Sequence, residues 1–411
     1  MNAYKYSIVI PVLNGMETLR LTLPEMLKIN RDDVEWVISD NWSDDNLYEL
    51  VLGLKDPRVK VCRPEKRLPM GDNLEFAYSN ATGKWQGHLG DDDFLMPSRF
   101  TILDYIIRNN PDVSIIRGEF IRYIWHDHPV RAEANKLKPG KYYSGTCQIA
   151  DSKAFARKSL NKKQVHGGGA WVVHHDIIDK IRKRAGFFAR NQAVEFFGMR
   201  AALALSNKVA LLDIPIYVMG RHTGSAAEIG LKKGRENQST QKKWDWAFEH
   251  PQPYEFCPFQ YKSYTTVSLD SAMRVATIFG NDFGGQIDYW YWYDILYREI
   301  KKNIKGKVIS EEMLNKYWEV VSTLPAKIRW KLKYEIFVKG IYSSYPVKIL
   351  LPFRPRKKIR KLLAGSNKSN MESKYGWESM TDARDLFGAY NIVELAMAFE
   401  NTHKDLFAQY K

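Results

Sequence analysis

Three consecutive carboxylates, Asp91, Asp92 and Asp93, follow a short apolar run that ends at Leu89, and Pro97 closes the loop after them. Like charges held so close repel one another, and a bound cation relieves that repulsion. Oxygen ligands at a strand end suit Mg²⁺ or Mn²⁺, which such sites share with the phosphates of a substrate. The triplet therefore predicts a metal-diphosphate site, although an isolated acidic run is also typical of a solvated turn.

Two earlier apolar runs also end in polar residues. The run Tyr6–Gly15 is β-branched and apolar up to its last residues, and leucines spaced by four then predict a helix. The run Val34–Asp45 turns polar at Asp40. Strands that alternate with helices in this way indicate a mostly parallel sheet, whose ligands bind beyond the carboxyl ends of the strands. Asp40 and the acidic triplet should therefore share one edge of the sheet.

This order of segments resembles the inverting glycosyltransferases of family 2, and the resemblance covers about the first 225 residues. It implies an α/β protein with the GT-A fold, which is Rossmann-like, with a mostly parallel sheet flanked by helices. Residues 1–225 would then form the nucleotide-sugar-binding catalytic domain. Residues 226–411 would form a mostly helical, basic region for acceptor binding, membrane association or both.

The resemblance also implies a nucleotide-binding site at the strand ends. Asp40 would accept a hydrogen bond from the base, and Asn73 opens a helix in Leu68–Asp93, a long segment similar to the family's central block. The chain departs from the common pattern at Trp42, where many members have glycine, and at Asp72, where many have an arginine that contacts the diphosphate. The residues implied for nucleotide binding are Pro11, Val12, Asn14, Asp40, Ser43, Asn73 and Asp91.

The catalytic roles are likewise implied by the resemblance. Asp92 corresponds to the metal ligand, and Asp93 is a further ligand or its support. His222 follows a strand expected at Ile214–Met219, where a related histidine can reach the metal, and Arg221 is a candidate diphosphate contact. Glu195 is the candidate base that removes the acceptor proton. A solvated glutamate near a helix start is the alternative interpretation of Glu195.

The run His166–His175 contains three glycines, Trp171 and two adjacent histidines. Adjacent side chains diverge on a strand, so we do not expect His174 and His175 to form a zinc site. We interpret the run as a wall of the acceptor pocket, with Trp171 available to stack on a sugar.

Composition bounds the remaining possibilities. The 411 residues are 45% hydrophobic, which suffices for a large core, and the three cysteines show no paired spacing that would indicate disulfides. We expect neither a signal peptide nor an apolar stretch of about 18 residues that could span a bilayer. We expect the protein to be cytoplasmic. Peripheral association with the inner face of the cell membrane is the alternative.

The net charge of +15 is unevenly distributed. Residues 325–370 hold thirteen basic residues and one acid, interleaved with bulky apolar and aromatic residues. This mixture is typical of a surface that lies on anionic lipid, although a solvated basic face has similar charge. No nucleic-acid-binding motif accompanies it, so we expect no nucleic-acid partner. The helices expected after residue 226 are Ser268–Phe279, Gln286–Lys302, Ser310–Val321, Ala326–Lys339 and Thr381–Phe399.

Together these features predict a metal-dependent inverting glycosyltransferase that uses Mn²⁺ or Mg²⁺. The expected donor is a nucleotide sugar, UDP-linked, and the expected acceptor is a cell-envelope, lipid-linked or polysaccharide glycan. One alternative is a nucleotidyltransferase of similar fold, which usually needs a glycine-rich phosphate turn that the chain lacks. The other is a non-catalytic, membrane-associated scaffold with a degenerate glycosyltransferase domain.

Overall fold

The computed structural model of the chain describes residues 4–126, 134–138, 143–162, 168–190, 194–222, 254–260, 263–306, 311–343 and 380–410. The chain divides into two compact units. Unit 1 takes in Met1–Cys257, Lys262–Ile287 and Tyr375–Lys411, and unit 2 takes in Pro258–Tyr261 and Asp288–Lys374. The domain boundary expected between residues 225 and 226 lies outside the described residues.

Unit 1 is built on a mixed sheet with a parallel centre. Strand β1 (Tyr6–Val12) pairs in parallel with β2 (Val34–Asp40) on one side and with β4 (Trp85–His88) on the other, and β2 pairs in parallel with β3 (Val59–Cys62). Antiparallel β9 (Trp171–His174) joins β4 to β6 (Val113–Ile124), and β10 (Lys208–Met219) runs parallel to β6. The shorter strands are β5 (Phe94–Leu95), β7 (Lys136–Leu137), β8 (Cys147–Asp151) and β11 (Thr381–Asp382).

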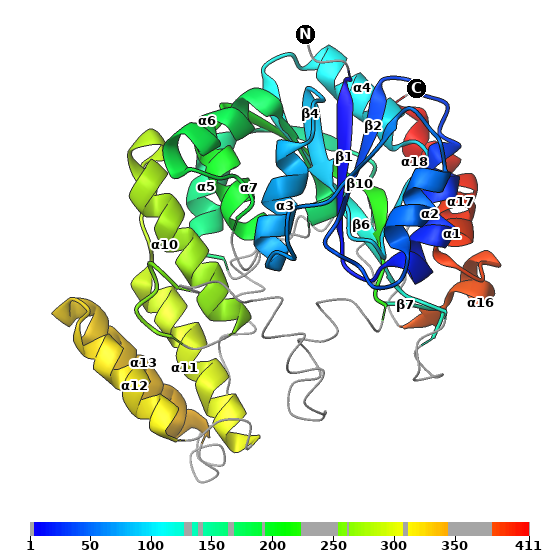
Figure 1. The fold of residues 1–411 in the computed structure, drawn as a ribbon. Coiled ribbons are helices and arrows are strands. Elements are labelled where there is room, and N and C mark those ends of the chain that lie inside the picture. The colour runs from blue at the N-terminus through cyan, green and yellow to red at the C-terminus, as the bar shows by residue number, and fades with distance from the viewer. Residues whose placement is uncertain are drawn as a thin grey trace. The chain divides into compact units, whose positions relative to one another are not determined.

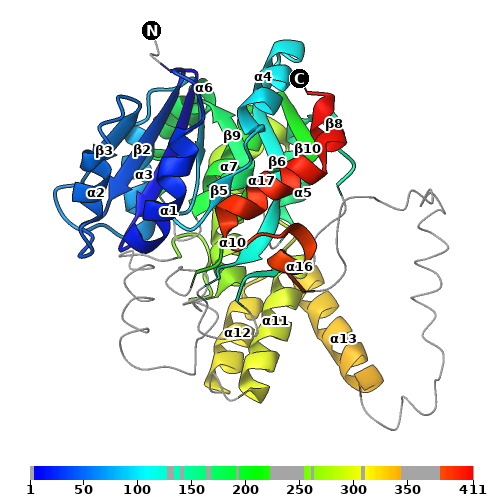
Figure 2. The ribbon, with the colours of Figure 1, turned by 90° about the vertical axis from the view of Figure 1, so that its right-hand side faces the viewer.

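Helices cover both faces of this sheet. Helices α1 (Met16–Leu27) and α17 (Ile392–Thr402) lie on one face, and α3 (Met70–Ser79), α6 (His175–Ala185) and α7 (Val194–Leu205) lie on the other (Figures 1 and 2). All seven residues of β2 are buried as a result, since a strand covered on both faces has no solvated side. The predicted α/β architecture of the GT-A type is confirmed. The remaining helices of unit 1 are α2 (Leu47–Gly53), α4 (Arg99–Asn109), α5 (Ser152–Leu160), η1 (Gly168–Ala170), α10 (Tyr264–Phe283), α16 (Ala383–Phe387) and α18 (Lys404–Ala408).

The last described segment returns to unit 1. Strand β11 pairs with β7, the backbone N–H of Ser98 donates to Glu400 at 3.0 Å, and the Tyr410 hydroxyl donates to the carbonyl of Gly145 at 2.5 Å. The single helix expected over Thr381–Phe399 is wrong. Gly388, with φ of 66°, ends α16, and α17 then begins separately.

Unit 2 contains α11 (Tyr289–Lys305), α12 (Glu312–Ser322) and α13 (Ala326–Ser343), which confirms the helical character expected for this part of the chain. Its core is aromatic. Trp292, Tyr293 and Tyr317 are fully buried, and the Tyr317 hydroxyl donates to the carbonyl of Tyr293 at 2.9 Å. Among the described helices, none combines the length and apolar composition that a bilayer span requires.

Candidate active site

The carboxyl ends of β1 and β2 carry two loops that are tied together by hydrogen bonds. The Asn14 backbone N–H donates to Ser43 Oγ at 2.9 Å, and the Asp44 N–H donates back to Asn14 Oδ1 at 2.8 Å. The N–H of Met16, the first residue of α1, donates to Asp45 Oδ2 at 2.8 Å. Asn14 has φ of 56°, a left-handed conformation that asparagine tolerates well. Asn14 and Ser43, both expected to line the nucleotide, therefore hold this rim in shape.

Asp40 closes β2 and is fully buried. Its Oδ1 accepts the backbone N–H of Ser43 at 3.0 Å, and its Oδ2 accepts two bonds from Arg63, from Nε at 2.8 Å and Nη2 at 2.5 Å. The register of β1 and β2 places Val12 opposite Asp40 and Pro11 opposite Ser39. These residues, expected at the base site, are thus brought together at one strand end.

Arg63 is a residue of this site that the sequence reasoning missed. It directly follows β3, and its guanidinium carbon lies 4.9 Å from the ring centroid of Trp42 and 4.2 Å from that of Tyr48. Trp42 is held in place because its Nε1–H donates to the carbonyl of Pro64 at 2.9 Å. The signal that could have identified Arg63 is its position, because a cationic residue just after a third parallel strand lies on the edge of the sheet where ligands bind.

The acidic triplet lies in the loop after β4, and its three members have different surroundings. Asp91 packs against Gly15, where an added Cβ would lie 2.2 Å from Asp91 Oδ2. Gly15 precedes the first turn of α1, so the positive end of that helix dipole faces the carboxylate. Asp93 is 7% exposed, and its two oxygens accept the backbone N–H groups of Gly90 at 3.0 Å and Gly220 at 2.9 Å. Asp93 therefore ties this loop to the end of β10.

Asp92 is 8% exposed, and its Oδ2 accepts the backbone N–H of His222 at 3.3 Å. Its carbonyl accepts the indole N–H of Trp125 at 2.9 Å. The Trp125 ring also packs edge-on to the His222 ring, with centroids 5.9 Å apart. His222 Nε2 lies 3.6 Å from Glu17 Oε2, at the start of α1. The fold thus brings His222 to the acidic loop, as the sequence analysis expected.

Burial is the main cause that raises the pKa of Asp91 to about 7, and the charge of Asp92 is the second cause. Burial and the charge of Asp93 raise the pKa of Asp92 as well. In both residues the folded protein disfavours the ionised form, because the carboxylates lose water and face like charge. A positive ion placed at this loop would reverse that penalty.

The donor set fits a divalent ion that is shared with a ligand. Among the described residues, three potential ligand atoms come within 4.8 Å of one another only at His174, His175 and Asp176, so the acidic triplet is not a closed metal cage. Mg²⁺ and Mn²⁺ do not need one, because they bind through one or two carboxylates and complete their coordination with phosphates and water. Asp91 and Asp92 supply the oxygens that such an ion would use.

Asn73 is buried within α3, and its side chain bonds to β2. Ser39 Oγ donates to Asn73 Oδ1 at 2.7 Å, and Asn73 Nδ2 donates to the carbonyl of Ser39 at 3.4 Å. Before it, Asp72 Oδ1 lies 2.6 Å from Nε of Arg190. The position where many relatives have an arginine therefore has an acid that pairs with an arginine from the α6–α7 connection.

The roles expected for two further residues are not tested. Glu195 lies in the first turn of α7, but its side chain is outside the described part of the structure. Arg221 follows β10 and is half-buried, and its carbonyl accepts the N–H of Trp125 at 3.3 Å. Their roles as base and diphosphate contact stay predictions.

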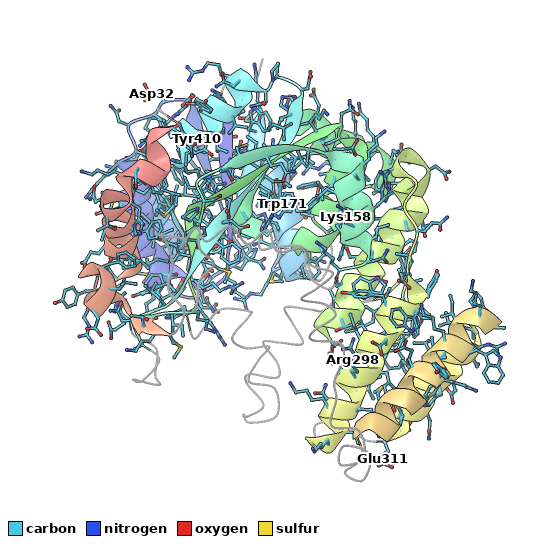
Figure 3. All side chains as sticks on the ribbon, turned by 180° about the vertical axis from the view of Figure 1, so that it is seen from behind. Asp32, Lys158, Trp171, Arg298, Glu311 and Tyr410 are labelled. Carbon is cyan, nitrogen blue, oxygen red and sulfur yellow. The ribbon has the colours of Figure 1, made fainter. Side chains whose placement is uncertain are left out.

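The expectation that Trp171 is available to stack on a sugar is wrong. Trp171 begins β9 inside unit 1, is 1% exposed, and has the Arg117 guanidinium 5.9 Å from its ring centroid (Figure 3). It is a core residue because β9 lies between β4 and β6. His166, at the start of the same run, lies outside the described residues.

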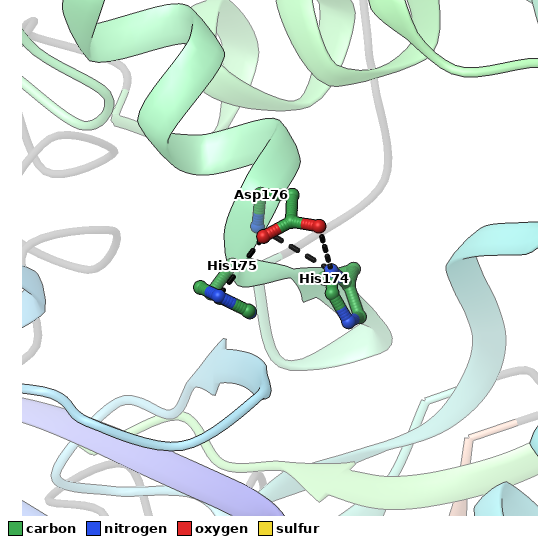
Figure 4. A group of neighbouring side chains, drawn as sticks. All are labelled: His174, His175 and Asp176. Atoms are coloured by element: carbon green, nitrogen blue, oxygen red, sulfur yellow. Dashed lines mark hydrogen bonds and ion pairs between the residues drawn. The ribbon is translucent and has the colours of Figure 1, made fainter. Parts of the chain in front are cut away.

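His174 and His175 do not diverge, because β9 ends at His174 and α6 begins at His175. Their ring centroids are 4.7 Å apart, and Asp176 Oδ1 lies 2.9 Å from His175 Nε2 (Figure 4). His174 pairs with Trp85 at the start of β4, the end opposite the acidic loop. Burial is the main cause that lowers the pKa of His174; the charge of Asp176 opposes it, and the smaller effects of His175, Lys84 and Lys180 add to it.

The strands, the buried carboxylates at their ends and the helix N-terminus beside them define an α/β protein of the GT-A type with an acidic ligand site. Residues 7–163 match the family model described as Glycosyl transferase family 2. This match supports the predicted family for the part of the chain that it covers, and it supports the predicted glycosyltransferase activity. No curated protein matches the chain.

Solved structures of S. aureus TarS are among those similar to this chain. TarS 1–349 in complex with UDP-GlcNAc is 13% identical, covers 72% of this chain and 88% of its own, and has a TM-score of 0.45. The same fragment with UDP is 13% identical, with coverage of 80% and 86% and a TM-score of 0.43. Likenesses this weak say nothing about the residues or ligands of this chain.

Proposed function

We propose that this protein transfers a sugar from a UDP-linked donor to a cell-envelope, lipid-linked or polysaccharide acceptor, with inversion and with Mn²⁺ or Mg²⁺. The observation that carries the proposal is the pair of half-buried Asp91 and buried Asp92, which lie at the carboxyl edge of the parallel strands and have raised pKa values. Because this site destabilises its ionised carboxylates, a divalent ion that binds together with a diphosphate would stabilise them.

The donor's nucleotide would lie over the ends of β1 to β3, and its diphosphate would lie at the acidic loop. Asp92, the predicted metal ligand, would hold the divalent ion together with Asp91, which was predicted on the nucleotide side, and the ion supplies Lewis-acid stabilisation of the departing diphosphate. Asp93 and the backbone N–H of His222 keep that loop in place. Gly15 lets the loop approach the N-terminus of α1, whose dipole also favours negative charge.

In the transfer step the acceptor hydroxyl oxygen attacks the anomeric carbon from the face opposite the diphosphate. The bond between that carbon and the diphosphate oxygen breaks, and the diphosphate leaves with the electron pair. Glu195 takes the hydroxyl proton, which an acid near the donor sugar is suited to do. Inversion at the anomeric carbon follows from this single displacement.

The test is product analysis with a panel of nucleotide sugars, with Mn²⁺ and in excess chelator. Release of nucleoside diphosphate that requires the metal supports the proposal. Release of nucleoside monophosphate or pyrophosphate would indicate a nucleotidyltransferase, and no turnover with any donor and acceptor would indicate a scaffold.

We further propose that unit 2 contacts an anionic membrane, which would present the acceptor. Most of residues 325–370 lie outside the described part, but the first turns of α13 are described. Trp330 is 73% exposed and Tyr334 is 67% exposed, beside the exposed cations Lys327, Lys331 and Lys333. Exposed aromatic rings among cations are typical of a lipid interface.

Vesicle co-sedimentation at low salt tests this surface. We expect binding to anionic but not neutral vesicles, and at least a fivefold loss of bound protein in Trp330→Ser/Tyr334→Ser. Tyr390→Ser is the matched control, because Tyr390 is also exposed, at 63%, but lies in unit 1. Equal binding by the double variant and the wild type would contradict the proposal.

A further inference from the structure

His174, His175 and Asp176 form a cluster at the junction between β9 and α6. Strand β9 ends at His174 and α6 begins at His175, so the chain turns there, and the centroids of the two imidazole rings lie 4.7 Å apart (Figure 4). The exposed fractions of the side chains are 24% for His174, 29% for His175 and 61% for Asp176. An ion from solvent can therefore reach all three residues.

The Asp176 carboxylate lies between the two imidazoles and directs one oxygen toward each ring (Figure 4). Its Oδ1 lies 2.9 Å from His175 Nε2, and its Oδ2 lies 3.6 Å from His174 Nδ1. His174 Nδ1 accepts the backbone N–H of Asp176 at 3.4 Å, so this nitrogen has its lone pair, and not a proton, on that side of the ring. A lone pair and a carboxylate oxygen thus face each other, and a cation placed between them would bind both.

The spacing of these atoms is close to that of a zinc site. Zinc binds imidazole nitrogen at about 2.0–2.1 Å and carboxylate oxygen at about 2.0–2.2 Å in a tetrahedron, so its ligand atoms stand about 3.3 Å apart. The two nitrogen–oxygen distances lie on either side of that value. One potential ligand atom from each of the three residues lies within 4.8 Å of the others, which is about 1.5 Å from the coordinating arrangement.

The chemistry of the ligand atoms selects the metal. Imidazole nitrogen suits Zn²⁺ and its neighbours among the transition metals, whereas Mg²⁺ and Mn²⁺ prefer oxygen ligands and bind nitrogen sites more weakly. We propose that His174, His175 and Asp176 bind Zn²⁺. Three protein ligands leave the fourth position of the tetrahedron to water.

This site is separate from the acidic loop. His174 lies opposite Trp85, the first residue of β4, whereas the acidic loop follows the other end of that strand. The two places also differ in ligand type, because Asp91 and Asp92 offer oxygen and the histidine cluster offers mainly nitrogen. The zinc site therefore does not depend on the proposed transfer reaction.

Metal titration of the full chain tests the site. The probes are Zn²⁺, followed by calorimetry, and Co²⁺, which takes similar ligands and absorbs visible light when nitrogen atoms bind it. His174→Asn and His175→Gln should each weaken Zn²⁺ binding by about tenfold or more and remove the Co²⁺ absorption. Asparagine at position 174 keeps a side-chain acceptor at the N-cap of α6, so the helix start is retained. Mn²⁺ should bind the cluster at least about tenfold more weakly than Zn²⁺.

Two aspartate variants of α6 form a matched pair. Asp176→Asn should also weaken Zn²⁺ binding by about tenfold. Asp179→Asn removes the same charge from an exposed position of the same helix that is outside the cluster, and it should change the affinity by less than about threefold. Asp92→Asn locates the metal, because it alters the acidic loop and should leave the Co²⁺ absorption intact.

The results that would overturn the inference are distinct from those that bear on the transfer reaction. Equal Zn²⁺ affinity and Co²⁺ absorption in the wild type and both histidine variants would overturn it. Loss of the Co²⁺ absorption in Asp92→Asn alone would place the metal at the acidic loop and would also overturn it. UDP binding with Mn²⁺ should be the same in His175→Gln and the wild type, and its absence from both would count against the proposed function only.

Discussion

Asp92→Asn should stabilise the metal-free protein at alkaline pH and abolish its response to metal and nucleotide. At pH 8 the ionised forms of Asp91 and Asp92 are destabilised by burial and by like charge, which raise the pKa of Asp91 to about 7. A carboxyl whose folded pKa is raised contributes stability below its unfolded pKa of roughly 4, and this contribution is lost as the pH rises through about 7. The neutral amide removes one charge of the pair.

The size of the effect is bounded by the pKa of Asp92, which burial and the charge of Asp93 raise to about 8. A rise of about four units corresponds to roughly 6 kcal/mol at 1.36 kcal/mol per unit, and this is an upper limit because buried sites relax and admit water. We expect about 1–3 kcal/mol to be realised. At about 2 °C per kcal/mol for a unit of this size, the midpoint of unfolding should move by about 2–6 °C.

The assay is the thermal midpoint of unfolding at pH 5.5 and pH 8, in chelator, then with Mn²⁺ and UDP. The wild type should lose stability from pH 5.5 to pH 8 in chelator and gain it when Mn²⁺ and UDP are added together, since ligands that bind only the folded state stabilise it. Asp92→Asn should show a smaller pH dependence and no gain. The control is Asp112→Asn, which removes an exposed carboxylate. A pH-independent wild type, or equal stabilisation by UDP in chelator, would refute the reasoning.

Two further substitutions test the site. Glu195→Gln should leave UDP affinity nearly intact and lower kcat by about a hundredfold or more; ordinary turnover would show that Glu195 is a solvated helix residue and not the base. Gly220→Ala should destabilise the protein by more than about 2 kcal/mol and weaken Mn²⁺-dependent UDP binding, because the new Cβ would lie 1.7 Å from the Asp92 carbonyl oxygen. Gly53→Ala is its control, since a Cβ there meets nothing within 4 Å, and equal denaturation midpoints for the two variants would contradict the packing argument.

Several features of this protein follow from local sequence. The apolar runs before Asp40 and Asp91 predicted strands, and their alternation with helical periodicity predicted a parallel sheet, because side-chain burial repeats with the period of each element. The carboxyl ends of parallel strands share one edge, so the acidic loop and Asp40 could be placed together without coordinates.

The helices of unit 2 were predictable for the same reason. The break at Gly388 was not recognised, although a glycine within a helical pattern is a known stop.

Tertiary structure decided what each side chain contacts. The pairing of Arg63 with Asp40 depends on the order of β1, β2 and β3, and the two bonds to Asp93 depend on β10 reaching the acidic loop. Trp171 is buried because antiparallel β9 lies between β4 and β6, an arrangement that no short-range pattern encodes. Local periodicity specifies which face of an element is apolar, whereas the neighbour that covers this face is chosen by packing among segments far apart in the chain.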